Sequence, residues 1–156
     1  MKKFKSKNTI SVNVIEKEYL HALEGLSEDG DFESIFFLRL IWETGLRPMD
    51  VMDLHPSEIM ERRIHRKSLK TGKYENYNMI SEETEKLKDR KSVQAGKYNN
   101  YNIVSEETEK LAAELLEKQG KFFSKNREHY FRRIRKNFVN PKMSVWEIVK
   151  YSREPL

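Results

Sequence analysis

The sequence predicts a mainly α-helical fold, with a small antiparallel β-hairpin or meander inserted after the third helix (α+β), in a single domain covering residues 1–156. Apolar residues recur at helical spacing through most of the chain, which is typical of amphipathic helices. An alternating stretch around a Lys-Thr-Gly-Lys sequence interrupts this pattern after Ile59, which indicates strands and a turn. A chain of 156 residues is long enough for one domain with a hydrophobic core.

Three helices are expected in the first part of the chain. Residues 14–26 place apolar side chains on one helical face. Phe32 to Thr44 is apolar on several faces, which predicts a central, buried helix, and Gly45 takes the usual position after a helix C-terminus. Pro48 suits the first turn of a third helix that runs through Leu54.

The remaining elements follow from changes in this pattern. Residues 61–69 and 74–80 alternate as strands around a turn at 70–73, and Ser81 is expected to cap a helix. Later helices are expected at 105–119, at about 127–139 and at 144–151.

A tandem duplication is the clearest feature of the sequence. Residues 72–87 and 96–111 are identical at 13 of 16 positions, at an offset of 24, and the two repeat units are 66–89 and 90–113. Two copies are too few for a solenoid, so we expect one copy to hold the ancestral position and the other to be an insertion. The second copy leads into an amphipathic helix with Leu111, Leu115 and Leu116 inward, so it is expected to be the integrated one.

Basic residues are concentrated in two stretches. The chain has 30 Lys and Arg against 25 Asp and Glu, a net charge of +5, and eight of the basic residues lie between Lys121 and Lys142. A second stretch, Arg62 to Lys73, contains no acid. Such clusters favour polyanions, and DNA is the expected partner. The residues expected to contact DNA are Arg62, Arg63, Lys67, Lys73, Arg133 and Lys136.

Other classes of protein are disfavoured by composition. The chain has no cysteine and its four histidines are scattered, so we expect no cofactor and no structural metal. No apolar run approaches the roughly 20 residues needed to span a bilayer, so we expect no membrane partner. The expected location is the cytoplasm.

Residues 38–59, LRLIWETGLRPMDVMDLHPSEI, resemble the first conserved block of the tyrosine recombinase (phage integrase) catalytic domain. Thr44-Gly45-Leu46-Arg47 carries the match. The resemblance implies a helical, catalytic-domain-like bundle that acts in DNA recombination or DNA integration. It leaves open whether the chain forms an oligomer on DNA. The family's Arg at this position grips the scissile phosphate, which implies that role for Arg47. A guanidinium beside a helix start suits a phosphate.

Two further motifs extend the resemblance. The family carries a Lys on a hairpin turn, often in Lys-Thr-Gly-Lys, that protonates the leaving 5′ oxygen, and Lys70 matches it. The family's His-x-x-Arg motif aligns with Arg132 and Arg135, where Arg135 is the second phosphate-gripping residue and Arg132 replaces the His. His129 with Arg132 is an alternative frame. The catalytic residues that the resemblance implies are therefore Arg47, Lys70, Arg132 and Arg135.

The resemblance covers about residues 12–150 and includes no position for the family's nucleophilic tyrosine. Tyr151 is the tyrosine nearest the end of the sequence, and we expect its side chain to pack on the last helix rather than to act as the nucleophile. Strand cleavage is therefore expected to be impaired. A metal-dependent nuclease is the alternative, because clustered carboxylates such as Glu82, Glu83 and Glu85, or their copies Glu106, Glu107 and Glu109, suit Mg²⁺.

Overall fold

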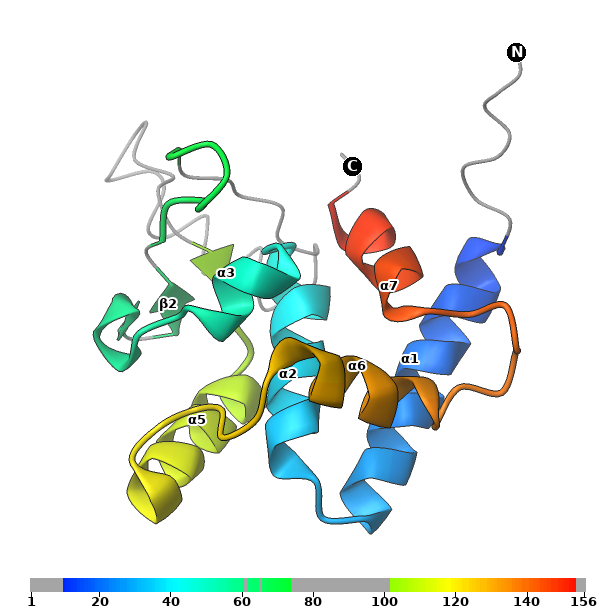
Figure 1. Cartoon of the computed structure of the whole chain (residues 1–156), viewed down its shortest axis with the longest axis horizontal. Coiled ribbons are helices and arrows are strands. Elements are labelled where there is room, and N and C mark those ends of the chain that lie inside the picture. Colours follow the sequence, from blue (N-terminus) through cyan, green and yellow to red (C-terminus); the bar gives the residue numbers. More distant parts are fainter. Residues whose placement is uncertain (1–9, 61, 65, 74–101, 154–156) are drawn as a thin grey trace.

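A computed structural model of the chain describes residues 10–60, 62–64, 66–73 and 102–153. The fold is mainly α-helical with a small antiparallel sheet, as the sequence predicts (Figure 1). The elements, in chain order, are α1 (Val12–Glu28), α2 (Phe32–Thr44), α3 (Pro48–Met52), a 3₁₀ turn (Pro56–Glu58), β1 (Ile59–Met60), β2 (Arg63–Ile64), β3 (Asn102–Ile103), α5 (Glu106–Gln119), α6 (Arg127–Arg135) and α7 (Val145–Ser152).

Helix α2 is the centre of the fold. It packs against α1, α3, α5, α6 and α7, and these helices surround it in Figure 1. Its side chains at Phe36, Phe37, Leu38, Leu40 and Ile41 are fully buried. The prediction of a central buried helix with these bounds is confirmed, because a helix that is apolar on several faces is stable when those faces are buried in the core.

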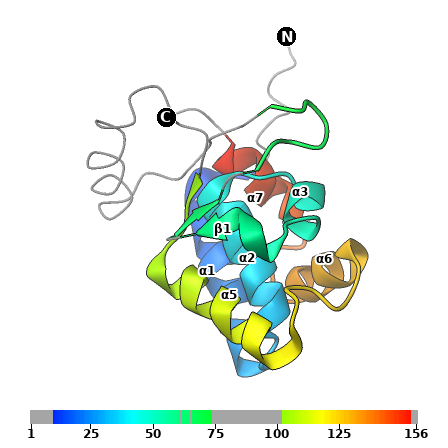
Figure 2. The same ribbon diagram turned by 90° about the vertical axis from the view of Figure 1, so that its left-hand side faces the viewer.

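The sheet has three short strands in the order β1-β2-β3, all antiparallel, and lies beside α5 (Figure 2). Ile64 of β2 faces Ile59 on one side and Asn102 on the other. Strand β3 and the start of α5 come from the second repeat unit. The strand expected at 74–80, the cap expected at Ser81 and the helix expected to follow it lie outside the described residues.

The second copy of the duplication forms a long helix, as expected. α5 begins after Ser105, whose hydroxyl accepts a hydrogen bond from the Thr108 amide at 3.2 Å, and ends at Gly120, which has a φ of +76°. Leu111 and Leu115 are buried, and Leu116 packs against the core.

Two helices are shorter than the sequence predicts. α3 ends at Met52 rather than Leu54, because Leu54 turns into the core while Asp53 closes the helix. α6 ends at Arg135 rather than Val139. The buried carboxylate of Glu18 accepts hydrogen bonds from the amides of Val139 at 2.8 Å and Asn140 at 2.6 Å, which holds that backbone out of a helix.

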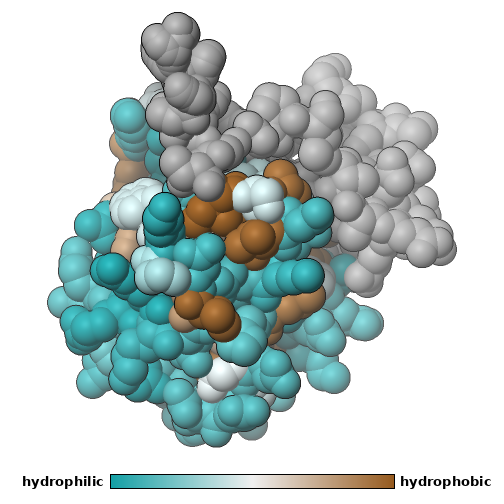
Figure 3. All heavy atoms as spheres, turned by 90° about the vertical axis from the view of Figure 1, so that its right-hand side faces the viewer, coloured by the Kyte–Doolittle hydropathy of each residue, from teal (hydrophilic) through white to brown (hydrophobic). Residues whose placement is uncertain are grey.

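Most of the surface visible in Figure 3 is hydrophilic, and hydrophobic atoms gather there in small patches. Across the part of the chain that the structure describes, no helix has the length and apolar character needed to cross a membrane. The large apolar side chains that are exposed among these residues are Val12, Leu20, Phe32, Met49, Leu69, Val139 and Trp146.

Candidate nucleic-acid interface

A cavity of about 490 Å³ lies between α3, the turn at 69–70, the start of α6 and the end of α7. We call it the cationic pocket. Its lining consists of Arg47, Pro48, Met49, Asp50, Leu69, Lys70, Arg127, Trp146, Val149 and Arg153. Four of these residues are cations, and they come from four separate segments of the chain. Arg47 and Lys70, which the resemblance singles out, are therefore brought together.

The Thr-Gly-Leu-Arg segment turns sharply to present Arg47. The buried Thr44 hydroxyl donates to the Leu40 carbonyl at 2.6 Å and accepts from the Leu46 amide at 3.1 Å. Gly45 has a φ of +73°, which a side chain would strain, and Leu46 is buried. Arg47 is extended, as a residue before proline prefers, and its side chain lines the pocket.

The turn that carries Lys70 is fixed to α3 by hydrogen bonds and ion pairs. The buried Asp50 carboxylate accepts from the Leu69 amide at 2.8 Å, and the Ser68 hydroxyl accepts from the Lys70 amide at 3.1 Å. The Ser68 amide donates to the Lys73 carbonyl at 2.8 Å, and Gly72 has a φ of +70°. The turn expected at 70–73 is confirmed.

Arg66 joins this turn to α3. Its guanidinium donates to Asp53 Oδ2 at 2.6 Å and to the Asp53 carbonyl at 2.8 Å, and lies 3.3 Å from Glu58 and 3.7 Å from Asp50. Burial lowers the pKa of Arg66, but the hydrogen bond to Asp53 and the Glu58 carboxylate outweigh it and raise the pKa above its ordinary value. Arg66 is thus a structural residue that positions Lys70.

Arg127, the first residue of α6, supplies a third cation. Its guanidinium carbon lies 5.4 Å from the ring centre of Phe131 and 6.0 Å from that of Trp146, within cation–π range. The two rings pack edge to face at 5.3 Å. An ion pair with Glu128 at 3.2 Å further orients the guanidinium.

Arg153 closes the pocket from the end of α7. Its Nη1 donates to the Gly45 carbonyl at 2.6 Å, which holds α7 against the segment that carries Arg47. Sequence reasoning did not select Arg127, Trp146 or Arg153. Arg127 was visible as a basic residue at a predicted helix start, but no motif pointed to the other two.

The resemblance implies that Arg47 and Arg135 contact one phosphate, but of these two residues the pocket lining includes only Arg47. Arg132 and Arg135 are exposed on α6 and do not line it, whereas Arg127 does. Helix geometry gives the reason. Arg135 is eight residues after Arg127, about 12 Å further along the axis and on a different azimuth. The frame that places Arg132 and Arg135 at the phosphate therefore selects the wrong end of α6 for this pocket.

The other residues expected to contact DNA lie in varied settings. Lys67 and Lys73 are exposed on the segment that carries Lys70, and Lys136 is exposed where α6 ends. Arg63 is half-buried in β2. Arg133 donates to Asp31 at 2.8 Å, which fixes α6 to the start of α2, and this hydrogen bond raises the pKa of Arg133.

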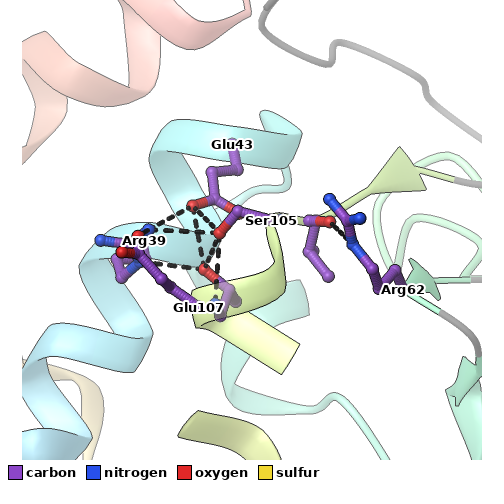
Figure 4. A network of polar contacts seen from close by, with 7 residues as sticks. Arg39, Glu43, Arg62, Ser105 and Glu107 are labelled. Carbon is purple, nitrogen blue, oxygen red and sulfur yellow. Dashed lines mark hydrogen bonds and ion pairs between the residues drawn. The ribbon is translucent and has the colours of Figure 1, made fainter. Parts of the chain in front are cut away.

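Arg62 belongs to a polar region that fixes the second repeat unit to α2 (Figure 4). Its Nε donates to the Val104 carbonyl at 2.9 Å, and its φ is +64°. Next to it, Glu43 of α2 accepts from the Ser105 amide at 2.8 Å and from the Thr108 hydroxyl at 2.9 Å. Arg39 donates to Glu107 at 2.8 Å. These contacts hold the start of α5 against α2.

Tyrosine side chains do not line the cationic pocket within the described ranges. Tyr151 donates to Glu16 at 2.7 Å, and its ring lies 5.1 Å from that of Trp42, which fits a packing residue. Tyr130 is buried and donates to Glu33. Burial, followed by this hydrogen bond, raises the pKa of Tyr130 far above its ordinary value, so its hydroxyl stays protonated.

The carboxylates considered for a metal site give no such site where the structure describes them. Glu82, Glu83 and Glu85 lie outside the described residues. Glu106, Glu107 and Glu109 occupy the first turn of α5, where acidic residues complement the helix dipole, and Glu107 pairs with Arg39. No group of three potential ligands is found among the described residues.

No protein-family model, curated protein or solved structure matches this chain. A proposal for the function therefore rests on the geometry of the cationic pocket and on the distribution of charge along the chain.

Proposed function

We propose that this chain binds DNA, with the cationic pocket as a site for a backbone phosphate. The observation that carries the proposal is the convergence of Arg47, Lys70, Arg127 and Arg153 on one cavity from four segments of the chain. Cations at a recessed site attract a phosphate more strongly than scattered surface cations, because the low-dielectric walls focus their field. Arginine also offers paired donors that match phosphate oxygens.

The lining of the pocket contains more basic than acidic residues. Asp50 is its one acidic lining residue, and its carboxylate already accepts from the Leu69 amide and lies beside Arg66. Lys67 and Lys73 are exposed on the segment that carries Lys70 and add positive charge to that segment. Phosphate contacts of this kind position a protein on DNA without reading the base sequence.

The resemblance of residues 38–59 to a tyrosine recombinase block supports the same function, since Arg47 is the residue that the family uses on a phosphate. We propose that the chain has a tyrosine-recombinase-like scaffold and acts on DNA in the cytoplasm. Strand cleavage is impaired in this proposal, because no tyrosine of the described residues lines the pocket and the hydroxyls of Tyr151 and Tyr130 donate to Glu16 and Glu33.

A salt titration of DNA binding tests the proposal. Fluorescence anisotropy with a labelled duplex should give log affinity falling with log salt at about −0.9 per phosphate contact. Lys70→Gln should reduce that slope by about one contact. Lys118→Gln removes the same charge from α5, outside the pocket, and should leave the slope unchanged. Absence of binding at low salt, or equal effects of the two variants, would overturn it.

Supercoiled plasmid separates binding from cleavage. Incubation with the protein should retard the plasmid without nicking it, both in the presence of Mg²⁺ and in EDTA. Nicking that EDTA abolishes would instead favour the metal-dependent nuclease, and nicking that persists in EDTA would show that strand cleavage is retained.

A further inference from the structure

The cationic pocket has an apolar side as well as a charged one. Three of its lining residues are large apolar side chains with high exposure: Met49 is 50% exposed, Leu69 57% and Trp146 47%. They come from three different segments, as the cations do. Exposed apolar groups gathered at a recessed site mark a place where a ligand covers them.

A phosphate alone would leave this apolar side in water. The cavity of about 490 Å³ is within the range of roughly 300–1,000 Å³ that small-molecule sites occupy, which is more than a single phosphate needs. The complementary ligand therefore carries a negative group and a flat, apolar surface next to each other. One nucleotide of a DNA strand has both.

The base faces of a regular duplex are covered by their stacked neighbours. An unpaired base exposes its faces, and aromatic side chains bind such faces with little dependence on sequence. Trp146 is the aromatic residue among those that line the pocket, and the guanidinium carbon of Arg127 lies 6.0 Å from its ring centre. Charge and stacking surface are thus adjacent.

We propose that the cationic pocket accepts one unpaired nucleotide of single-stranded DNA, with its base against Trp146, Met49 and Leu69 and its phosphate on Arg47, Lys70 and Arg127. This inference rests on the proposed DNA-binding function and narrows its substrate to strands with unpaired bases.

Trp146 reports directly on this contact. The sequence contains two tryptophans. Trp42 does not line the pocket, and its ring stacks on that of Tyr19 with 4.0 Å between the ring centres. Trp42→Phe therefore leaves Trp146 as the sole tryptophan reporter. An oligothymidine should quench its fluorescence. An abasic strand of equal length has the same phosphates and should bind about tenfold more weakly, without quenching, because base stacking is lost. A blunt duplex of the same length should also bind more weakly than oligothymidine.

Variants then assign the effect to the apolar side of the pocket. Trp146→Ala should remove the preference for oligothymidine over the abasic strand, because the base loses its stacking surface. Because Trp146 also contacts Phe131, Met49→Ala and Leu69→Ala provide a second test at side chains that are half-exposed or more. Leu20→Ala, on α1 and 63% exposed, is the matched control and should keep the preference.

Each outcome decides between the two proposals. Equal affinity for oligothymidine and the abasic strand, or tighter binding to duplex, overturns the unpaired-nucleotide site and leaves DNA binding intact. Failure to bind any of the three at low salt overturns the proposed function itself.

Discussion

Removing residues 72–95 would join Thr71 directly to Gly96 and preserve an intact Lys-Thr-Gly-Lys turn. The deleted segment contains five basic and five acidic residues, so the net charge stays at +5. Strand β3, α5 and every contact in Figure 4 come from residues that remain. If the second copy holds the ancestral position, we expect this variant to fold with the same helices and sheet.

The expected gain in stability follows from the length of the connection. The chain between Ile64 at the end of β2 and Asn102 at the start of β3 shortens from 37 to 13 residues. If both connections are treated as flexible loops of these lengths, closing the shorter one costs less conformational entropy, by (3/2)RT ln(37/13), or about 0.9 kcal/mol. For a chain of this size, that corresponds to a melting temperature about 3 °C higher.

Urea unfolding followed by circular dichroism at 222 nm measures this difference. The midpoint should rise while the m value stays unchanged. A variant that is unfolded, or that loses more than 1 kcal/mol, would refute the reasoning, since the first copy would then contribute buried contacts. Deletion of residues 66–89 is the matched partner. It substitutes Arg90-Lys91-Ser92 for Arg66-Lys67-Ser68 but brings Gln94 to the place of Lys70, so it should fold and bind DNA more weakly than the first deletion.

Two further predictions concern the helical core. Gly25→Ala should destabilise the protein by about 1–3 kcal/mol in urea unfolding, because an added Cβ would lie 2.0 Å from Asn137 Oδ1, and Asn137→Ala in the same chain should restore most of the loss. If the double variant is no more stable than Gly25→Ala, the clash is not the cause. Burial raises the pKa of Asp31, but the hydrogen bonds from Arg133 and Ser34 outweigh burial and lower that pKa overall. The ionised Asp31 therefore stabilises the folded protein above about pH 4, and this stabilisation is lost as the pH falls below that value. Asp31→Asn should therefore flatten the acid limb of a plot of melting temperature against pH, and an unchanged limb would contradict this.

Much of the fold followed from local patterns in the sequence. α2 was predicted with its observed bounds because it is apolar on several faces and ends at Gly45, whose left-handed backbone conformation favours glycine. The ends of α3 and α6 were predicted too late in the chain, because they depend on tertiary contacts. The carboxylate that ends α6 belongs to Glu18, more than a hundred residues earlier, and no local pattern reports such a partner.

The candidate site was predicted only in part, for a related reason. Arg47 and Lys70 lie in short motifs with a turn that can be read locally, and the structure brings both to one pocket. Arg153 and Trp146 reach that pocket because α7 packs across α1 and α2, which the sequence does not disclose. In α6, four arginines compete for the same role, and only the direction in which the helix packs selects Arg127.

The Arg66–Asp50 pair gives a prediction that links stability to the proposed site. Both side chains are buried, at 7% and 2% exposure, and Asp50 holds the Leu69 amide beside Lys70. Arg66→Met leaves the Asp50 charge buried without its cation, which should cost about 3–5 kcal/mol and weaken DNA binding by loosening the turn. Adding Asp50→Asn removes the buried charge but keeps a side-chain oxygen for the Leu69 amide. The double variant should therefore be at least about 1 kcal/mol more stable than Arg66→Met alone. Lys67→Met, on the same segment but exposed, should change stability by less than about 0.5 kcal/mol. Strictly additive losses at Arg66 and Asp50 in urea unfolding would mean that the two residues act independently, and that Arg66 positions the Lys70 turn through Asp53 and Glu58 alone.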